Sequence, residues 1–411
     1  MTHSEFHEGK TSRNRELEPT DDPLNRAKAI HLFERGPFSS VLARLPGGRS
    51  ADRGLERQAI ALALISWVPL LLASLGQDNF RFGASTTALL TDFGAYARCL
   101  GAIPLLVMAD RVCGGRLNLI AHNFIDAGMV RDSDRPRFDA LADSTWRLCT
   151  SLWAAVVIIA SVYALLATLL EVIPQGEIPS WHRSGEARTL SLAGWWHLLV
   201  SAPLLLALFM AWMWRLLVWT RFLWRIARLP IRLCAAHPDR AGGLKFVGYS
   251  VRAFAPIGAA LGAVMAGRIA NHVWHTGEKL SNFEVTAGGV VGVVLLLFGA
   301  PLLTFTLRLM QEWREGLSSY GRLAGQLGFQ FEDKWFYRHQ RVDPGVLEAS
   351  DFSAAVDLSG YASNVYDLRL APGDLKSFIV LAGATAIPLL PVILIAAPVD
   401  VLLKEIGAIL F

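Results

Sequence analysis

The stretch HPDRAGGLKFVGYSVRAFAPIGAALGAVMAGRIANHVWH, residues 237–275, decides the fold. It begins as a short polar loop and turns into an apolar segment near Ala253. Small residues then recur four apart, at Gly258, Gly262 and Ala266. In a bilayer, where lipid is as apolar as the helices, small residues let helix backbones approach closely and gain packing energy. The pattern predicts a membrane helix in close contact with another helix.

A second row of small residues follows the same helix at Ala259, Ala263 and Gly267, and the next apolar segment repeats the pattern with Gly288 and Gly292. We therefore expect the segments at 253–275 and 285–310 to form the packed centre of a membrane protein.

Composition supports this class. The chain has 411 residues, of which 53% are hydrophobic and only 18% charged, against roughly 25% in soluble domains. Its four cysteines form no CxxC pair, so the sequence indicates free thiols and neither a zinc site nor a redox dithiol. Residues 1–57 are polar and charged, so we expect no cleavable signal peptide. No cofactor or nucleic-acid partner is indicated.

Seven apolar segments predict an all-α integral membrane protein, because about 20 helical residues cross a hydrocarbon core. They lie at about 59–76, 95–110, 148–173, 195–219, 253–275, 285–310 and 377–397. The second is short and contains Arg98. Lys and Arg number six or more in alternate flanking segments and at most two in the others, which requires every segment to cross. Because basic residues stay inside, the N-terminus is expected in the cytoplasm and the C-terminus outside.

The predicted organisation has four parts. Residues 1–57 are a basic N-terminal segment, whose part at 26–45 suggests either a helix on the membrane surface or a solvated tail. Residues 58–310 hold six membrane helices. Residues 311–376 form cytosolic helices that cover the inner face or mediate assembly, and 377–411 hold the last span, broken by prolines, and a tail.

Tryptophans and arginines alternate at the end of the fourth span, where Trp212, Trp214, Trp219 and Trp224 interleave with Arg215. Four further arginines follow at helical spacing: Arg221, Arg225, Arg228 and Arg232. We interpret the run as an aromatic belt with one stripe of arginines that binds anionic lipid headgroups. A voltage sensor is disfavoured because these arginines follow the apolar stretch.

The polar loop at 237–243 holds a second group of candidates: His237, Asp239, Arg240, Gly242 and Gly243. Its HPD triplet occurs in J-domain co-chaperones, but there it joins two soluble helices and here it joins membrane segments. Glycines and a proline are typical of a turn. We expect a loop-ordering role, with a catalytic pair or proton site as the alternative.

Taken together, several marks resemble a widespread but functionally uncharacterised family of bacterial multi-pass membrane proteins. The marks are HPDRAGGL at 237–244, Tyr320-Gly321-Arg322-Leu323-Ala324, Phe331 with Lys334-Trp335, Asp351, Asp357-Leu358, and IPLLPVIL at 387–394. The resemblance covers roughly residues 210–400. Family members often end the late amphipathic segment in an Arg-rich stretch, where this chain has only Arg369. The resemblance implies a bacterial inner-membrane location and no established activity.

A pore formed by several copies of the chain is the first functional hypothesis. Arg268, His272 and His275 share one helix face, with Asn271 beside it. Repeated around a symmetry axis, that face gives a cationic ring, which favours anions. The alternative is that these residues anchor the helix at the outer interface.

Three other functions stay open. One is a membrane scaffold or a stress or defence component. Another is a lipid-acting enzyme that uses the HPD loop, although the paired acidic motifs of such enzymes are absent. A secondary transporter is disfavoured by the odd number of spans and by the lack of duplication between the two halves of the chain.

Overall fold

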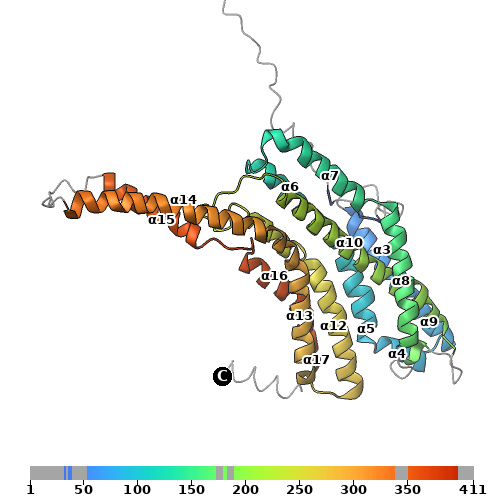
Figure 1. Cartoon of the computed structure of the whole chain (residues 1–411). Helices are drawn as coiled ribbons and strands as arrows, with labels where there is room; N and C mark the ends of the chain where they lie inside the picture. The colour runs from blue at the N-terminus through green and yellow to red at the C-terminus, as the bar shows by residue number, and fades with distance from the viewer. Residues whose placement is uncertain are drawn as a thin grey trace, which may run out of the picture.

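The computed structural model describes residues 32–33, 36–38, 53–172, 179–182, 189–337 and 350–396, which consist of helices and their connections (Figure 1). Seven helical segments of this part are long and apolar enough to cross a membrane, and they coincide with the seven predicted ones. They are Gly54–Gln77, Phe93–Asp126, Leu152–Leu169, Leu192–Ala227, Lys245–Thr276, Leu280–Phe336 and Leu375–Ile393. The all-α membrane class is thereby confirmed, including the weak second segment.

The first six spans form three consecutive helical hairpins with one plan. Each begins with a single helix: α3 (Arg53–Gln77), α8 (Leu152–Val172) and α12 (Ala255–Thr276). A short helical piece lies in each connection: α4 (Ala84–Leu90), η4 (Ser180–His182) and η7 (Leu280–Phe283). The second helix of each hairpin is longer and has an irregular part between two regular ones. In the first hairpin the three parts are α5 (Phe93–Tyr96), η1 (Ala97–Ala102) and α6 (Ile103–Asp126). In the second they are α9 (Leu192–Trp196), η5 (His197–Ser201) and α10 (Ala202–Ala227), and in the third α13 (Glu284–Gly299), η8 (Ala300–Phe305) and α14 (Thr306–Glu332).

The three irregular parts each lie beside a recurring Pro-Leu-Leu sequence. Each has a proline at its end or start, Pro104, Pro203 and Pro301, which are 99 and 98 residues apart and are followed each time by Leu-Leu. Proline donates no N–H and crowds the carbonyl four residues back, so the preceding turn opens into a π-helix at η1 and η5. The Pro-Leu-Leu sequence therefore recurs by thirds of the chain, a spacing that the comparison of halves did not test. The irregular parts lie at different depths, because Phe305 of η8 stacks on Phe124 at the end of α6, whereas Ala97 of η1 lies beside Gly267 of α12.

The remaining described elements connect the hairpins or follow them, and the last three form the seventh span. They are η2 (Asp132–Asp134), α7 (Arg135–Cys149), η6 (Lys245–Gly248), α11 (Tyr249–Ala253), η9 (Asp333–Tyr337), α15 (Ser350–Tyr366), α16 (Leu375–Ala386), η11 (Ile387–Leu389) and α17 (Leu390–Ala396). We call the end that carries α7 and α14 the arm end, and the end that carries α4 and η7 the far end (Figure 1). Pro388 lies in η11 and Pro391 in α17, whereas Pro398 lies outside the described residues.

Helices α14 and α15 pack against each other and extend sideways from the arm end as a two-helix arm (Figure 1). The sixth span does continue into a long helix, as expected, but it bends at η8. Only the root of the arm touches the bundle, where a Cβ on Gly316 would meet Ala235 and Val365. The expectation that these helices cover the inner face is therefore wrong for the outer part of the arm.

Candidate functional site

Helix α12 is the centre of the second half of the bundle, and other segments of the same chain pack directly against its glycines. A Cβ on Gly258 would press on the Thr385 hydroxyl of α16, and one on Gly262 would collide with the Thr385 backbone. On the opposite side, a Cβ on Gly267 would meet Ala97 and Gly94. The predicted close packing of both small-residue rows is thus present, and Ala266 of the first row is buried as well.

Helix α13 differs from α12, although both were expected to form the packed centre. A Cβ added at Gly288, Gly289 or Gly292 would meet no atom within 4 Å among the described residues. Helix α13 packs mainly on α16 and makes little contact with α12. The predicted close packing is therefore found within the chain on α12, which contacts α16 and the α5–η1 segment, and the glycine face of α13 is open.

The four candidate pore residues on α12 have different surroundings. Asn271 donates from Nδ2 to Asp92 Oδ1 at 2.7 Å, so it holds α12 to the start of α5. His275 Nδ1 lies 3.0 Å from the Asn271 carbonyl on its own helix, and His272 lies against the Phe283 ring, with centroids 5.8 Å apart. Arg268 is exposed and has no side-chain partner in the described part of the chain.

Asp92 connects three parts of the far end. Besides Asn271, its carboxylate accepts the Ala95 N–H at 2.9 Å as the N-cap of α5, and the Trp181 indole N–H at 3.0 Å. Arg98, one and a half turns further, has Nη2 3.8 Å from Asp92 Oδ2. We call these residues, together with His197, the far-end cluster. It ties the connection between α8 and α9 to α5 and α12.

The histidines of this region stack on one another. The rings of His182 and His197 have centroids 4.9 Å apart and lie against Trp181. Atom Nδ1 of His197 is buried without a hydrogen-bond partner in the described residues. The two histidine rings therefore pack as part of the far-end cluster. Sequence analysis missed the cluster, although Asp92 directly before an apolar span is an N-cap signal.

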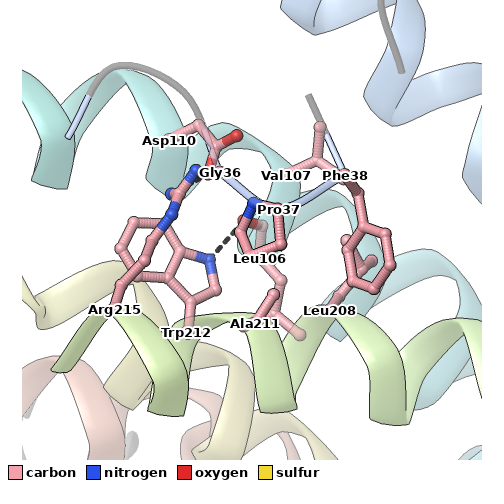
Figure 2. Close-up of a pocket in the computed structure, with 10 residues that line it drawn as sticks. All are labelled: Gly36, Pro37, Phe38, Leu106, Val107, Asp110, Leu208, Ala211, Trp212 and Arg215. Carbon is pink, nitrogen blue, oxygen red and sulfur yellow. Dashed lines mark hydrogen bonds and ion pairs between the residues drawn. The ribbon is translucent and has the colours of Figure 1, made fainter. Parts of the chain in front are cut away.

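A second polar contact lies near the arm end. Arg215 on α10 is only 3% exposed and forms an ion pair with Asp110 on α6. Its guanidinium stacks over the Trp212 ring at 4.4 Å and fills the space where a side chain on Gly36 would stand (Figure 2). Trp212 donates its indole N–H to the Leu106 carbonyl at 3.0 Å.

The described part of the N-terminal segment covers the ion pair between Asp110 and Arg215. Phe33 is buried with its ring 5.5 Å from that of Trp219, and its N–H donates to Asn118 Oδ1 at 3.1 Å. A cavity of about 20 Å³ remains beneath Pro37 (Figure 2). It has room for a single water molecule. The rest of the surface helix predicted at 26–45 lies outside the described residues.

The run of tryptophans and arginines is split by the structure. Trp212 and Trp219 are core residues, Trp214 is half-buried and only Trp224 of the four is exposed, so the belt interpretation is wrong for Trp212 and Trp219. The helix ends at Ala227, because Pro230 follows shortly and a proline disfavours helical backbone at the residue before it. Arg232 is therefore outside the helix, and its N–H donates to the Met129 carbonyl. The four arginines do not form one stripe.

Three of these arginines nevertheless face outward. Arg225, Arg228 and Arg232 are exposed, and Arg228 lies over the Trp224 ring at 3.6 Å. Arg221 is half-buried and donates to Ser144 Oγ at 3.1 Å. Contact with lipid headgroups stays a prediction.

The HPD loop is ordered around one carboxylate. Asp239 accepts the backbone N–H groups of Ala241, Gly243 and Lys245 at 2.8, 3.0 and 3.1 Å, and His237 Nδ1 lies 2.8 Å from it. Burial raises the pKa of Asp239, but these hydrogen bonds outweigh burial and hold its pKa below the ordinary value.

The glycines of this loop have a geometric reason. Gly242 and Gly243 have φ of +65° and +93°, and Arg240 has φ of +55°. Arg240 also pairs with Asp367 at 3.2 Å, and its carbonyl accepts the Arg369 N–H at 2.8 Å. The loop thus joins the end of α10 to the end of α15, which fits the expected ordering role.

No group of three or more His, Cys, Asp or Glu side chains among the described residues is arranged to hold a metal ion. All four cysteines are free. Comparison with protein-family models, curated proteins and solved structures finds no match. The family resemblance seen in the sequence therefore stays a prediction.

Proposed function

We propose that copies of this chain assemble in a bacterial inner membrane into a pore that favours anions. The observation that carries the proposal is Arg268, an exposed charge on a membrane helix that has no side-chain partner among the residues that the structure describes. A charged side chain inside a membrane is costly unless it faces water or a partner. Its neighbour Asn271 bonds to Asp92, whereas Arg268 has no such partner in the described ranges.

The position of Arg268 suggests the entrance of the pore. Asn271 is level with Asp92, which caps α5 at the far end, and Arg268 is three residues, about 4.5 Å, deeper along the helix. His272 and His275 lie on the same side of α12. A basic entrance raises the local concentration of anions.

Assembly is supported by α13, because no atom of the described residues meets its glycine face, which would therefore accept a closely packed helix of a neighbouring copy. We propose that α13 of one copy packs on the next and that Arg268 then faces the enclosed route. We place the arm end in the cytoplasm, because the basic loops belong to it.

The test is ion flux through purified protein in liposomes. We expect a chloride permeability that exceeds that of potassium, and loss of this preference in Arg268→Gln. The matched control is Arg131→Gln, which removes the same charge from an exposed position at the arm end. Absence of conductance for chloride and potassium across pH and membrane tension, or equal selectivity in the two variants, would contradict the proposal.

The recurring Pro-Leu-Leu sequence favours one second candidate, a secondary transporter. Transporter folds are commonly built from internal repeats with broken helices. Here the second helix of each hairpin has an irregular part beside a Pro-Leu-Leu sequence. Saturation of flux with substrate concentration and exchange of substrate across the membrane would favour a transporter, whereas a linear current with a reversal potential set by the ions would favour the pore.

A further inference from the structure

Two arginines from different helices meet at the arm end of the bundle. Arg116 lies on α6 and Arg252 lies on the short helix α11, which packs on both α6 and α16. Atom Nη1 of Arg116 donates to the backbone carbonyl of Arg252 at 3.4 Å. One turn earlier on α6, the Cys113 thiol donates to the Ala253 carbonyl at 2.9 Å, so the two helices lie side by side here. The contact brings two positive side chains to one place.

Neither arginine is neutralised by the part of the chain that the structure describes. No carboxylate oxygen in this part lies within 4 Å of a side-chain nitrogen of Arg116 or Arg252. The guanidinium of Arg252 lies instead over the Tyr249 ring, 4.3 Å from its centroid. Both arginines are exposed, so their positive charge is open to an anion.

The acidic residues of α6 do not compensate this charge. Asp110 is six residues before Arg116 and is paired with Arg215 of α10. Asp126 is ten residues beyond Arg116, about 15 Å further along the helix. The side of α6 that faces α11 is therefore positive.

The neighbouring elements add little negative charge. Neither η6 nor α11 contains an Asp or Glu. At the start of α16, the half-buried Asp374 accepts the Ser377 hydroxyl at 3.1 Å, and the exposed Lys376 lies beside it. Glu56 at the start of α3 is exposed and forms no ion pair with another described residue. The surroundings of the two arginines thus carry a net positive charge.

The depth of the pair matches the boundary between the hydrocarbon core and the headgroups. Arg252 directly precedes α12, which ends at Thr276. The 24 residues between these positions span about 36 Å of helix, against a hydrocarbon core of about 30 Å. A span with Thr276 at one boundary therefore has Arg252 in the opposite headgroup layer, on the side that we place in the cytoplasm. Basic pockets between membrane helices on that side bind anionic headgroups, and a guanidinium can donate two parallel hydrogen bonds to a phosphate.

We propose that Arg116 and Arg252 together bind the phosphate of one anionic phospholipid of the inner leaflet, at the junction of α6 and α11. Two neutral acceptors, the Arg252 carbonyl and the Tyr249 ring, hold the side chains in place without cancelling their charge. The site consists of residues from a single chain, so the proposal is independent of the pore and of assembly.

The test measures lipid binding to the purified full-length protein by native mass spectrometry, with added phosphatidylglycerol or phosphatidylcholine. We expect the wild type to bind the anionic phosphatidylglycerol in preference. Arg116→Gln/Arg252→Gln should weaken its binding about 25-fold, because each arginine near a membrane surface contributes about a fivefold factor. The matched control is Arg131→Gln/Arg147→Gln, which removes the same charge from exposed positions before and on α7 and should leave the affinity unchanged.

A second double variant separates the site from the fold. Arg116→Lys/Arg252→Lys keeps both charges but cannot donate two parallel hydrogen bonds from one side chain, so we expect an affinity between those of the wild type and the glutamine variant. The unfolding temperature without added lipid checks that each variant is folded, and the lysine variant carries the test if the glutamine variant is not. Equal affinities in the arginine-to-glutamine variant and its control, or wild-type affinity in the lysine variant, would overturn the proposal. So would equal binding of the two lipids by the wild type, or displacement of the lipid by inorganic phosphate, which would assign the site to free phosphate.

Discussion

Helices α12 and α13 carry nearly the same sequence signal and have opposite surroundings. Both are apolar spans with glycines four apart, and both were expected to pack through those glycines. On α12 the space beside each of Gly258, Gly262 and Gly267 is filled by atoms of the same chain, whereas on α13 no described atom lies in the space beside Gly288 and Gly292. Spacing alone therefore identifies a close-contact face but does not say whether the contact lies inside the chain or between chains.

The largest effect is expected from Gly262→Val. Its Cβ collides with the backbone of Thr385, which cannot move without shifting α16. Overpacking of this kind costs about 1–3 kcal/mol, and more when backbone must move. We expect loss of folded protein or a strongly lowered unfolding temperature in detergent. Stability equal to that of the wild type would show that α16 does not pack on α12 as described.

A smaller loss is expected at the far end of α12. Asn271→Leu removes the hydrogen bond to the Asp92 carboxylate. Hydrogen bonds to charged groups contribute about 1.5–3 kcal/mol, so the unfolding temperature should fall by less than in Gly262→Val. The control is His275→Leu, since His275 contacts only its own helix. An equal fall of the unfolding temperature in both variants would show that the hydrogen bond of the far-end cluster does not stabilise the fold.

The HPD loop gives a pH-dependent effect. The folded pKa of Asp239 is held below its ordinary value of 3.8, so its stabilisation is fully present above that value and is lost as pH falls through the folded pKa. Asp239→Asn should lower stability by roughly 1 kcal/mol at neutral pH, and the difference from wild type should vanish in acid.

Unfolding measured against pH tests this prediction, with Asp357→Asn on α15 as an exposed control. A difference between wild type and Asp239→Asn that stays constant below pH 3 would argue against the carboxylate as the centre of the loop.

The smallest effect on the single chain is expected from Gly288→Val. The added side chain enters open space, so the free energy of unfolding should change by less than about 0.5 kcal/mol. Assembly is the sharper readout. If α13 packs on another copy, the variant should dissociate into smaller species in native mass spectrometry, whereas unchanged assembly would mean that this face contacts lipid.

Much of the fold could be predicted from the sequence because apolar length is a local property. All seven spans, the continuation into α14 and the α15 helix follow from it. The partners of each helix could not, because a row of glycines has the same pattern whichever neighbour fills it. The end of α10 was missed although Pro230 marks it, and the recurring Pro-Leu-Leu sequence was missed because it divides the chain into thirds.

The candidate site was harder to predict than the fold. Arg268 and Asn271 are three residues apart, yet one is exposed and the other bonds to Asp92, which is 179 residues away in the sequence. The pair formed by Asp110 and Arg215 left a clearer signal, since opposite charges at corresponding depths of two spans are expected to meet. Longer-range contacts of this kind require the three-dimensional structure.

A density map of the purified protein in lipid nanodiscs tests the central claim most directly. The account predicts several copies around an axis, with the glycine faces of α13 in contact with neighbouring copies and Arg268 beside a water-filled route. A single copy whose α13 face and Arg268 side chain both meet lipid would contradict it.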